Sequence, residues 1–146
     1  MAEAAQSPSA GRERPLSPHI QIYRRSIHMM MSIVHRITGA ALYFGTLLLA
    51  AWLMAAAMGP GPFALVDGLA SSLLGKLVLL GYSWALIHHM FGGIRHLIWD
   101  TGRGMDLASV RTISWATIIG SLAVTLAVWL LAARMSGGLF LSGGPL

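Results

Sequence analysis

The sequence has 146 residues and contains no cysteine. Without cysteine the chain cannot form a disulfide bond, and it cannot by itself ligate an iron–sulfur cluster or build a thiolate zinc site. Any metal or redox cofactor held by this chain must therefore be bound through other side chains.

Charged residues are also scarce. They make up 10% of the sequence, whereas hydrophobic residues make up 55%. A soluble domain of this size needs far more charge on its surface. Three stretches carry no charged side chain: residues 37–58, 77–94 and 112–133. Each has about the 18–22 residues that an α-helix, rising about 1.5 Å per residue, needs to cross a hydrocarbon layer of about 30 Å.

These uncharged stretches predict the fold class. Backbone polar groups in lipid must find their hydrogen bonds within the segment, so helices are the expected form. The sequence therefore predicts an all-α membrane protein with three transmembrane helices, at about residues 30–58, 69–99 and 110–134. The predicted layout is a polar amino-terminal segment at 1–28, a transmembrane domain at 29–135 and a short tail at 136–146.

Acidic residues number five against ten lysine and arginine residues, which gives a net charge of +5. Most of the basic residues outside the helices precede the first helix or lie between the second and third, whereas the loop at 59–68 has one acid and no base. By the positive-inside rule, the amino terminus and the second loop face the cytoplasm, and the carboxyl terminus faces the periplasm. The charge is thus a topology signal, with no nucleic-acid partner expected. The arginines that give this topology signal are Arg12, Arg14, Arg24 and Arg25 before the first helix, and Arg103 and Arg111 between the second and third.

Polar groups crowd one end of the second predicted helix, in "HHMFGGIRHLIWD" at 88–100. At about 100° per residue, positions spaced 3, 4, 7 and 11 apart share a helix face. His88 points about a quarter turn away from the face that contains His89. Glycines on that face let a helix or a flat ligand approach the backbone closely. The face contains Tyr82, Ala85, His89, Gly92, Gly93, His96 and Asp100.

The first predicted helix offers a matching polar face. Because the two helices run in opposite directions, its histidine and arginine lie at roughly the depth of Arg95 and His96. His89 is about ten residues inside Trp99, which places it on the order of 15 Å deep in the membrane. The two faces are therefore expected to surround one pocket that opens toward the cytoplasm. On the first helix this face comprises Ser32, His35, Arg36, Gly39, Ala40 and Tyr43.

An imidazole at that depth is costly unless it is neutral and liganded. Haem iron accepts histidine as an axial ligand, and glycines such as Gly92 and Gly93 leave room for its flat macrocycle. The cationic or donor groups available to the haem propionates are Arg36, His35, Arg95 and His96, and arginine pairs with carboxylates at two points. Because only one deep histidine face is visible, a second axial ligand would have to come from another chain.

Simpler explanations of the same residues stay open on spacing alone. An intramembrane histidine beside glycine is often a hydrogen-bonding contact between helices, and Gly92–Gly93 is a common form of packing notch. Arg95 and Asp100 would then form only a boundary salt bridge, worth about 1 kcal/mol or less.

Three motifs taken together favour the haem-ligand explanation over these simpler ones. The stretches "RPLSPHIQIYR" (14–24), "SIVHRITG" (32–39) and "HHMFGGIRHLIWDTG" (88–102) resemble, in order and spacing, the cytochrome b-556 subunits of succinate dehydrogenase. These are the larger of the two membrane anchors of respiratory complex II. The form "SPHIQIYR" is similar to that of the mitochondrial and related bacterial branch, so the resemblance implies a bacterial inner membrane protein.

The resemblance implies a role for particular residues. The axial haem b ligand would be His89, four positions before G-I-R-H, with the paired histidine supplied by a second anchor subunit that completes the helical bundle. Ser32 and Arg36 would contribute to the quinone site, close to the iron–sulfur subunit. His35, Arg95 and His96 match positions near the haem propionates. His88 departs from relatives that carry an aromatic residue there.

The implied function is the passage of electrons from the iron–sulfur subunit to ubiquinone in a succinate:ubiquinone oxidoreductase that also contains a flavoprotein subunit. Nothing in this chain would bind flavin or oxidise succinate. The alternatives are the anchor of a quinol:fumarate reductase that works in the opposite direction and, from a different class, a haem-free membrane subunit that acts as a proton relay or a scaffold.

Overall fold

The computed structural model describes residues 17–135. The start of the predicted amino-terminal segment (1–16) and the whole predicted tail (136–146) lie outside the described residues. Within this range a short 3-10 helix, η1 (His19–Ile22), precedes four α-helices. They are α1 (Ile27–Met58), α2 (Pro60–Ser71), α3 (Leu73–Asp100) and α4 (Leu107–Met135). The helices α1, α3 and α4 are long and apolar enough to cross a membrane, which confirms the predicted all-α membrane protein with three transmembrane helices.

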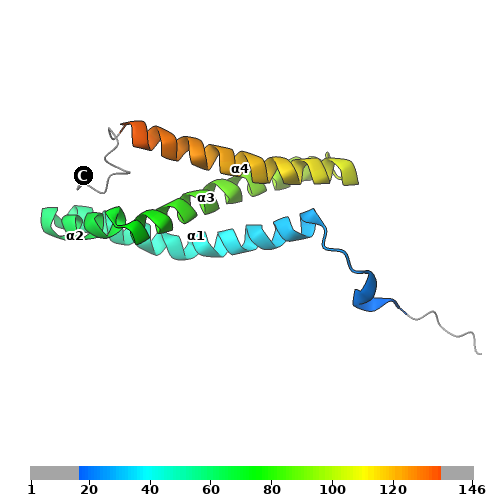
Figure 1. Ribbon diagram of the computed structural model, residues 1–146, viewed down its shortest axis with the longest axis horizontal. Helices are drawn as coiled ribbons and strands as arrows, with labels where there is room; N and C mark the ends of the chain where they lie inside the picture. Colours follow the sequence, from blue (N-terminus) through cyan, green and yellow to red (C-terminus); the bar gives the residue numbers. More distant parts are fainter. Residues whose placement is uncertain (1–16, 136–146) are drawn as a thin grey trace, which may run out of the picture.

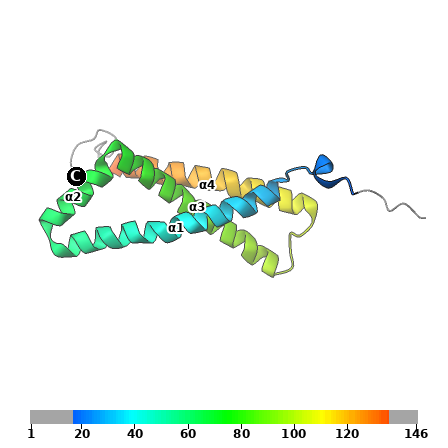
Figure 2. The same ribbon diagram turned by 90° about the horizontal axis from the view of Figure 1, so that it is seen from below.

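The helix α3 lies between the other two long helices. Figure 1 shows α4 on one side of α3 and α1 on the other, and Figure 2 shows α1 and α3 crossing each other. The start of α1 and the connection between α3 and α4 lie at one end of the bundle, whereas α2 and the end of α4 lie at the other (Figures 1 and 2). Among the described residues, Arg24 and Arg25 are therefore at the same end of the bundle as Arg103 and Arg111.

The short helix α2 occupies a segment that the sequence predicted to be a loop at 59–68. Gly59 ends α1 with φ 110°, a conformation that favours glycine, and Pro60 then begins α2, because proline is well suited to the first turn of a helix. Ser72, with ψ 159°, separates α2 from α3, and its side chain accepts a hydrogen bond from Gly75 N. The prediction that the second transmembrane helix begins near residue 69 was therefore wrong by a few residues, since it begins at Leu73.

The turn between α2 and α3 also requires a glycine. A Cβ atom at Gly75 would lie 2.1 Å from the carbonyl oxygen of Leu69, and this atom belongs to the backbone and cannot rotate away. The close approach therefore explains why the chain has glycine at this position.

The interior between the helices is small and largely polar. Large apolar side chains cover the outside of the bundle, as expected where lipid is the solvent, and small residues let the helices approach each other. On α4 four hydroxyl side chains are buried, and each donates a hydrogen bond to a carbonyl three or four residues earlier in its own helix. These residues are Ser114, Thr117, Ser121 and Thr125.

Asp106 immediately precedes α4 and caps it. Its carboxylate accepts a hydrogen bond from the backbone N–H of Ser109 at 2.9 Å, which satisfies one of the free donors at the start of the helix. Hydrogen bonds from the hydroxyl and the backbone of Ser109 hold the pKa of Asp106 below its ordinary value of 3.8. A carboxylate with a lowered pKa stabilises the folded state above its ordinary pKa, and this contribution is lost as the pH falls through the lowered value.

We expect Asp106→Ala to cause a small decrease in the thermal midpoint of the purified protein at neutral pH. The difference from the wild type is expected to shrink as the pH falls below 3.8, because the wild-type carboxylate then becomes protonated. Thermal scans across this pH range test the prediction, with Asp106→Asn as a control that keeps a neutral capping group. A difference that does not change with pH would contradict it.

Candidate functional site

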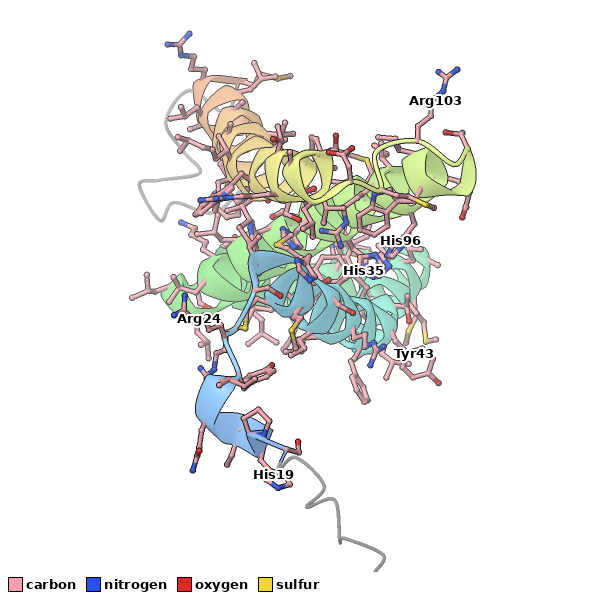
Figure 3. The ribbon with its side chains drawn as sticks, turned by 90° about the vertical axis from the view of Figure 1, so that its right-hand side faces the viewer. His19, Arg24, His35, Tyr43, His96 and Arg103 are labelled. Carbon is pink, nitrogen blue, oxygen red and sulfur yellow. The ribbon has the colours of Figure 1, made fainter. Side chains whose placement is uncertain are left out.

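Three histidines meet in the seam between α1 and α3. The rings of His35 and His89 stack with centroids 4.0 Å apart and planes 10° from parallel. The ring of His96 meets His35 edge-on at 5.3 Å. Figure 3 shows His35 on α1 and His96 on α3 directed toward each other. The tertiary structure thus brings together three of the residues that the sequence assigned to one pocket.

Glycines create the space for these rings. A Cβ atom at Gly39 would lie 2.9 Å from Cε1 of His89, and one at Gly92 would lie 2.2 Å from Cδ2 of His35. Gly93 differs from its neighbour, because nothing lies within 4 Å of the position that its Cβ would take. Gly39 and Gly92 therefore seat histidine rings, whereas Gly93, beside Gly92, leaves open space for a group from outside the chain.

The hydrogen bonds of His89 define which of its nitrogens carries the proton. Its Nδ1 lies 3.1 Å from the carbonyl oxygen of His35 and 3.3 Å from the hydroxyl oxygen of Thr38. A carbonyl oxygen only accepts, so Nδ1 carries the hydrogen and donates it. In a neutral ring the lone pair is then on Nε2, the nitrogen available to bind a metal. Thr38 was missed in the sequence, where only its place between His35 and Gly39 in "HRITG" could have indicated it.

The two adjacent histidines of α3 face different neighbours. His88 is 2% exposed, and its Nδ1 lies 3.1 Å from the hydroxyl oxygen of Ser121 on α4. That hydroxyl donates its own hydrogen to the carbonyl of Ile118, so His88 is the donor in this pair. Its ring also packs against Trp84, with centroids 5.1 Å apart. His88 therefore joins α3 to α4, and His89 joins α3 to α1.

Arg95 is buried, with 2% of its surface exposed, and it lies two helical turns beyond His88 on the same face of α3. Its guanidinium carbon lies 5.1 Å from the centre of the Trp99 ring. Its Nε and Nη1 atoms have no hydrogen-bond partner, and the same is true of the buried Nε2 of His35. The structure thus buries Arg95 against Trp99, whose ring His96 also meets edge-on at 5.4 Å, and leaves the donors of Arg95 available to an anionic group.

The predicted polar face of α1 is divided in the structure. Of its residues, His35 and Gly39 contact α3, whereas Ser32 and Arg36 are exposed on another side of the helix. Tyr43 is 73% exposed and points away from the histidine cluster in Figure 3. The prediction placed these residues on one face because it could not know which side of α1 packs against α3.

A cavity opens at the end of the bundle where α1 begins and α3 connects to α4, but Ser32 and Arg36 do not line it. This cavity has a volume of about 360 Å³ and is lined by His28, Trp99, Met105 and Val110. Exposed polar side chains on a membrane helix are costly in lipid, so the face with Ser32 and Arg36 is suited to contact with another protein or a polar ligand.

The donor set fits a haem better than a bare metal ion. Across residues 17–135, no three histidine, aspartate or glutamate side chains come together as a metal cage. A haem requires from this chain only one axial nitrogen, which His89 Nε2 can provide, and donors for its two carboxylates. The unpartnered nitrogens of Arg95 are donors of that kind, and Nε2 of His35 is one in the tautomer that carries the ring hydrogen there.

Comparison with known proteins gives an independent result. Residues 10–128 match the family described as succinate dehydrogenase/fumarate reductase transmembrane subunits. The chain is 46% identical over 115 residues to the succinate dehydrogenase cytochrome b556 subunit of Paracoccus denitrificans, a match that covers 79% of this chain and 87% of that one. It is 35% identical over 117 residues to the subunit of the same name from Rickettsia felis, covering 80% and 91% of the two chains. The mitochondrial cytochrome b560 subunit of Sus scrofa is 45% identical over 102 residues, covering 66% of this chain and 59% of that one.

Proposed function

Because this chain belongs to the family of succinate dehydrogenase/fumarate reductase transmembrane subunits, we propose that it anchors a succinate:ubiquinone oxidoreductase, binds one haem b through His89, and contributes Ser32 and Arg36 to the quinone-reduction site. The proposed partners are a second small anchor subunit, which supplies the other axial histidine, together with an iron–sulfur subunit and a flavoprotein subunit. The proposed location is a bacterial inner membrane, with the amino terminus in the cytoplasm and the carboxyl terminus in the periplasm.

The protonation of His89 carries the proposal of a haem ligand. Metal-bound histidines commonly donate their second ring N–H to a backbone carbonyl, which fixes the ring and makes the other nitrogen a better ligand. His89 has this arrangement, with Nδ1 directed at the carbonyl of His35. We propose that Arg95, His35 and His96 supply donors toward the propionates and that Gly93 borders the cofactor. Gly92 instead seats the ring of His35, and Arg36 lies on another side of α1. When bound, the haem would supply a site that stores one electron.

The chemistry proposed for Ser32 and Arg36 is stabilisation of negative charge on the quinone. Electrons from the iron–sulfur subunit raise the negative charge on the quinone oxygens. A guanidinium donates hydrogen bonds to such an oxygen and offsets its charge. The hydroxyl of Ser32, one helical turn before Arg36, lies on the same side of α1 and can donate to the ring or hold a water beside it. Both side chains are exposed and therefore available to a ligand between this chain and its partners.

The test is quinone reduction by membranes that contain the assembled complex. We expect Arg36→Gln to slow succinate-dependent quinone reduction by about 100-fold, as is typical when a donor to a developing oxyanion is removed. Ser32→Ala is expected to have a smaller effect in the same direction. Reduction of a water-soluble dye at the flavoprotein and the haem spectrum are both expected to remain unchanged.

The matched control is Arg103→Gln. Arg103 is an exposed arginine at the same end of the bundle, on the connection between α3 and α4, and Figure 3 shows it extending away from the helices. Equal losses in the two arginine variants would indicate a general effect of surface charge and would contradict the role of Arg36. Quinol-driven fumarate reduction that exceeds the succinate reaction would support the quinol:fumarate reductase alternative.

A further inference from the structure

The side chain of Thr38 on α1 contacts His89, the proposed haem ligand on α3. This contact is additional to the hydrogen bonds that Thr38 makes within its own helix. Its side chain is 3% exposed. Its hydroxyl oxygen lies 3.0 Å from the carbonyl oxygens of both Val34 and His35, and 3.3 Å from Nδ1 of His89 on α3. A threonine hydroxyl has one hydrogen and two lone pairs, so it can donate to its own helix and still accept from His89.

The hydrogen of His89 Nδ1 is shared between two acceptors. The carbonyl of His35 is one, at 3.1 Å, and the hydroxyl of Thr38 is the other. When Thr38 donates its hydrogen to Val34, its lone pair faces the imidazole. Both acceptors come from neighbouring turns of α1, so the position of α1 relative to α3 determines how much electron density the ring receives.

The ring of His89 is also held in place on more than one side. The ring of His35 stacks on it at 4.0 Å, and the backbone of Gly39 leaves no space for even a methyl group next to Cε1. A ring enclosed in this way cannot easily rotate to exchange its two nitrogens. The hydrogen bonds at Nδ1 therefore fix the direction of Nε2 as well as its protonation.

We propose that Thr38 is a positioning residue for His89, and that its hydroxyl keeps Nδ1 protonated, directs Nε2 outward and tunes the electron density that Nε2 gives to iron. This inference rests on the proposed function, since it assumes that His89 is an axial ligand. An acceptor at Nδ1 makes an imidazole a stronger donor and favours the oxidised iron, so loss of the acceptor is expected to favour the reduced form.

The test compares Thr38→Val with Thr38→Ser in the assembled complex. Valine keeps the shape of threonine without the hydroxyl, and serine keeps the hydroxyl without the methyl group. We expect the haem midpoint potential, measured by redox titration of the visible spectrum, to rise in Thr38→Val by up to about 59 mV, which is a tenfold change in the one-electron equilibrium. In Thr38→Ser it is expected to stay close to that of the wild type.

The matched control is Thr46→Val. Thr46 lies on the same helix and its hydroxyl donates to the carbonyl of Tyr43 in its own helix, but the residue is exposed and two turns away from Thr38. Its replacement is expected to leave the potential unchanged. If the potential of Thr38→Val also equals that of the wild type, or if Thr38→Ser shifts as much as Thr38→Val, the role of the hydroxyl is overturned.

A second measurement does not depend on the stability of any variant. In the wild-type complex with ¹⁵N-labelled histidine and the haem in its reduced, diamagnetic state, His89 is expected to give a protonated Nδ1 signal, with Nε2 bound to iron. A deprotonated Nδ1 would overturn the inference. If the wild-type complex contains no haem, the proposed function fails, whereas a haem whose potential and spectrum are insensitive to Thr38 contradicts only this inference.

Discussion

His89→Ala is expected to abolish the visible α-band of the haem in the purified complex, whereas His88→Ala is expected to retain it. The two residues are neighbours in the sequence but lie on different sides of α3. His89 faces α1, with Nδ1 bonded to the carbonyl of His35 and Nε2 left as a ligand. Alanine in its place provides no nitrogen for iron, so the loss is expected to be complete.

His88 serves as the matched control because it is the same residue type at nearly the same depth. It is 2% exposed and bonded to Ser121, so a ligand outside the bundle cannot reach it without separation of α3 from α4. His88→Ala is expected to lower the thermal stability of the complex, because it leaves a cavity and removes one hydrogen bond. Reduced-minus-oxidised visible spectra of the two variants test which of the two histidines binds the haem iron. Loss of the band only in His88→Ala would reverse the ligand assignment, and absence of the band from the intact wild-type complex would favour the proton-relay or scaffold alternatives.

Gly45→Ala is expected to destabilise the packing of α1 on α3 by about 1–3 kcal/mol, the usual cost of forcing an extra group into a filled interior. Gly45 is buried where α1 approaches α3. A Cβ atom there would lie 1.9 Å from Cε2 and 2.6 Å from Cδ2 of the Tyr82 ring. The ring or one of the helices must move, and a movement of α1 relative to α3 would also disturb the contact between His35 and His89.

Gly81→Ala is the control, since it makes the same substitution on α3 next to Tyr82 with nothing within 4 Å of the new methyl group. Both variants are measured by the temperature at which the detergent-solubilised complex loses its native absorption spectrum. We expect an earlier loss in Gly45→Ala and little change in Gly81→Ala. Equal thermal stability of the two variants would show that the contact between Gly45 and Tyr82 is easily rearranged.

Much of the architecture could be predicted from the sequence because it depends on local properties. The absence of charge over a membrane-spanning length identified α1, α3 and α4. Helical periodicity also identified the side of α3 that contacts α1, since Tyr82, His89, Gly92 and His96 all reach it. The helix α2 was missed because a segment with Gly59, Pro60 and Pro62 looks like a loop, although the first proline is placed where it can begin a helix.

The division of the polar residues was decided only by the tertiary structure. Periodicity gives the angle between two side chains around a helix axis, but it does not say which direction is occupied by a neighbouring helix. For that reason Ser32 and Arg36 were grouped with His35, although the packing turns His35 toward α3 and leaves Ser32 and Arg36 exposed. Thr38 and Ser121 were not recognised for the same reason, because a hydroxyl in an apolar helix acquires a role only when a histidine from another helix is brought within hydrogen-bonding distance of it. The sequence by itself thus determined the number of membrane-spanning helices, whereas the crossing of α1, α3 and α4 determined which neighbours hydrogen-bond to Nδ1 of His88 and of His89.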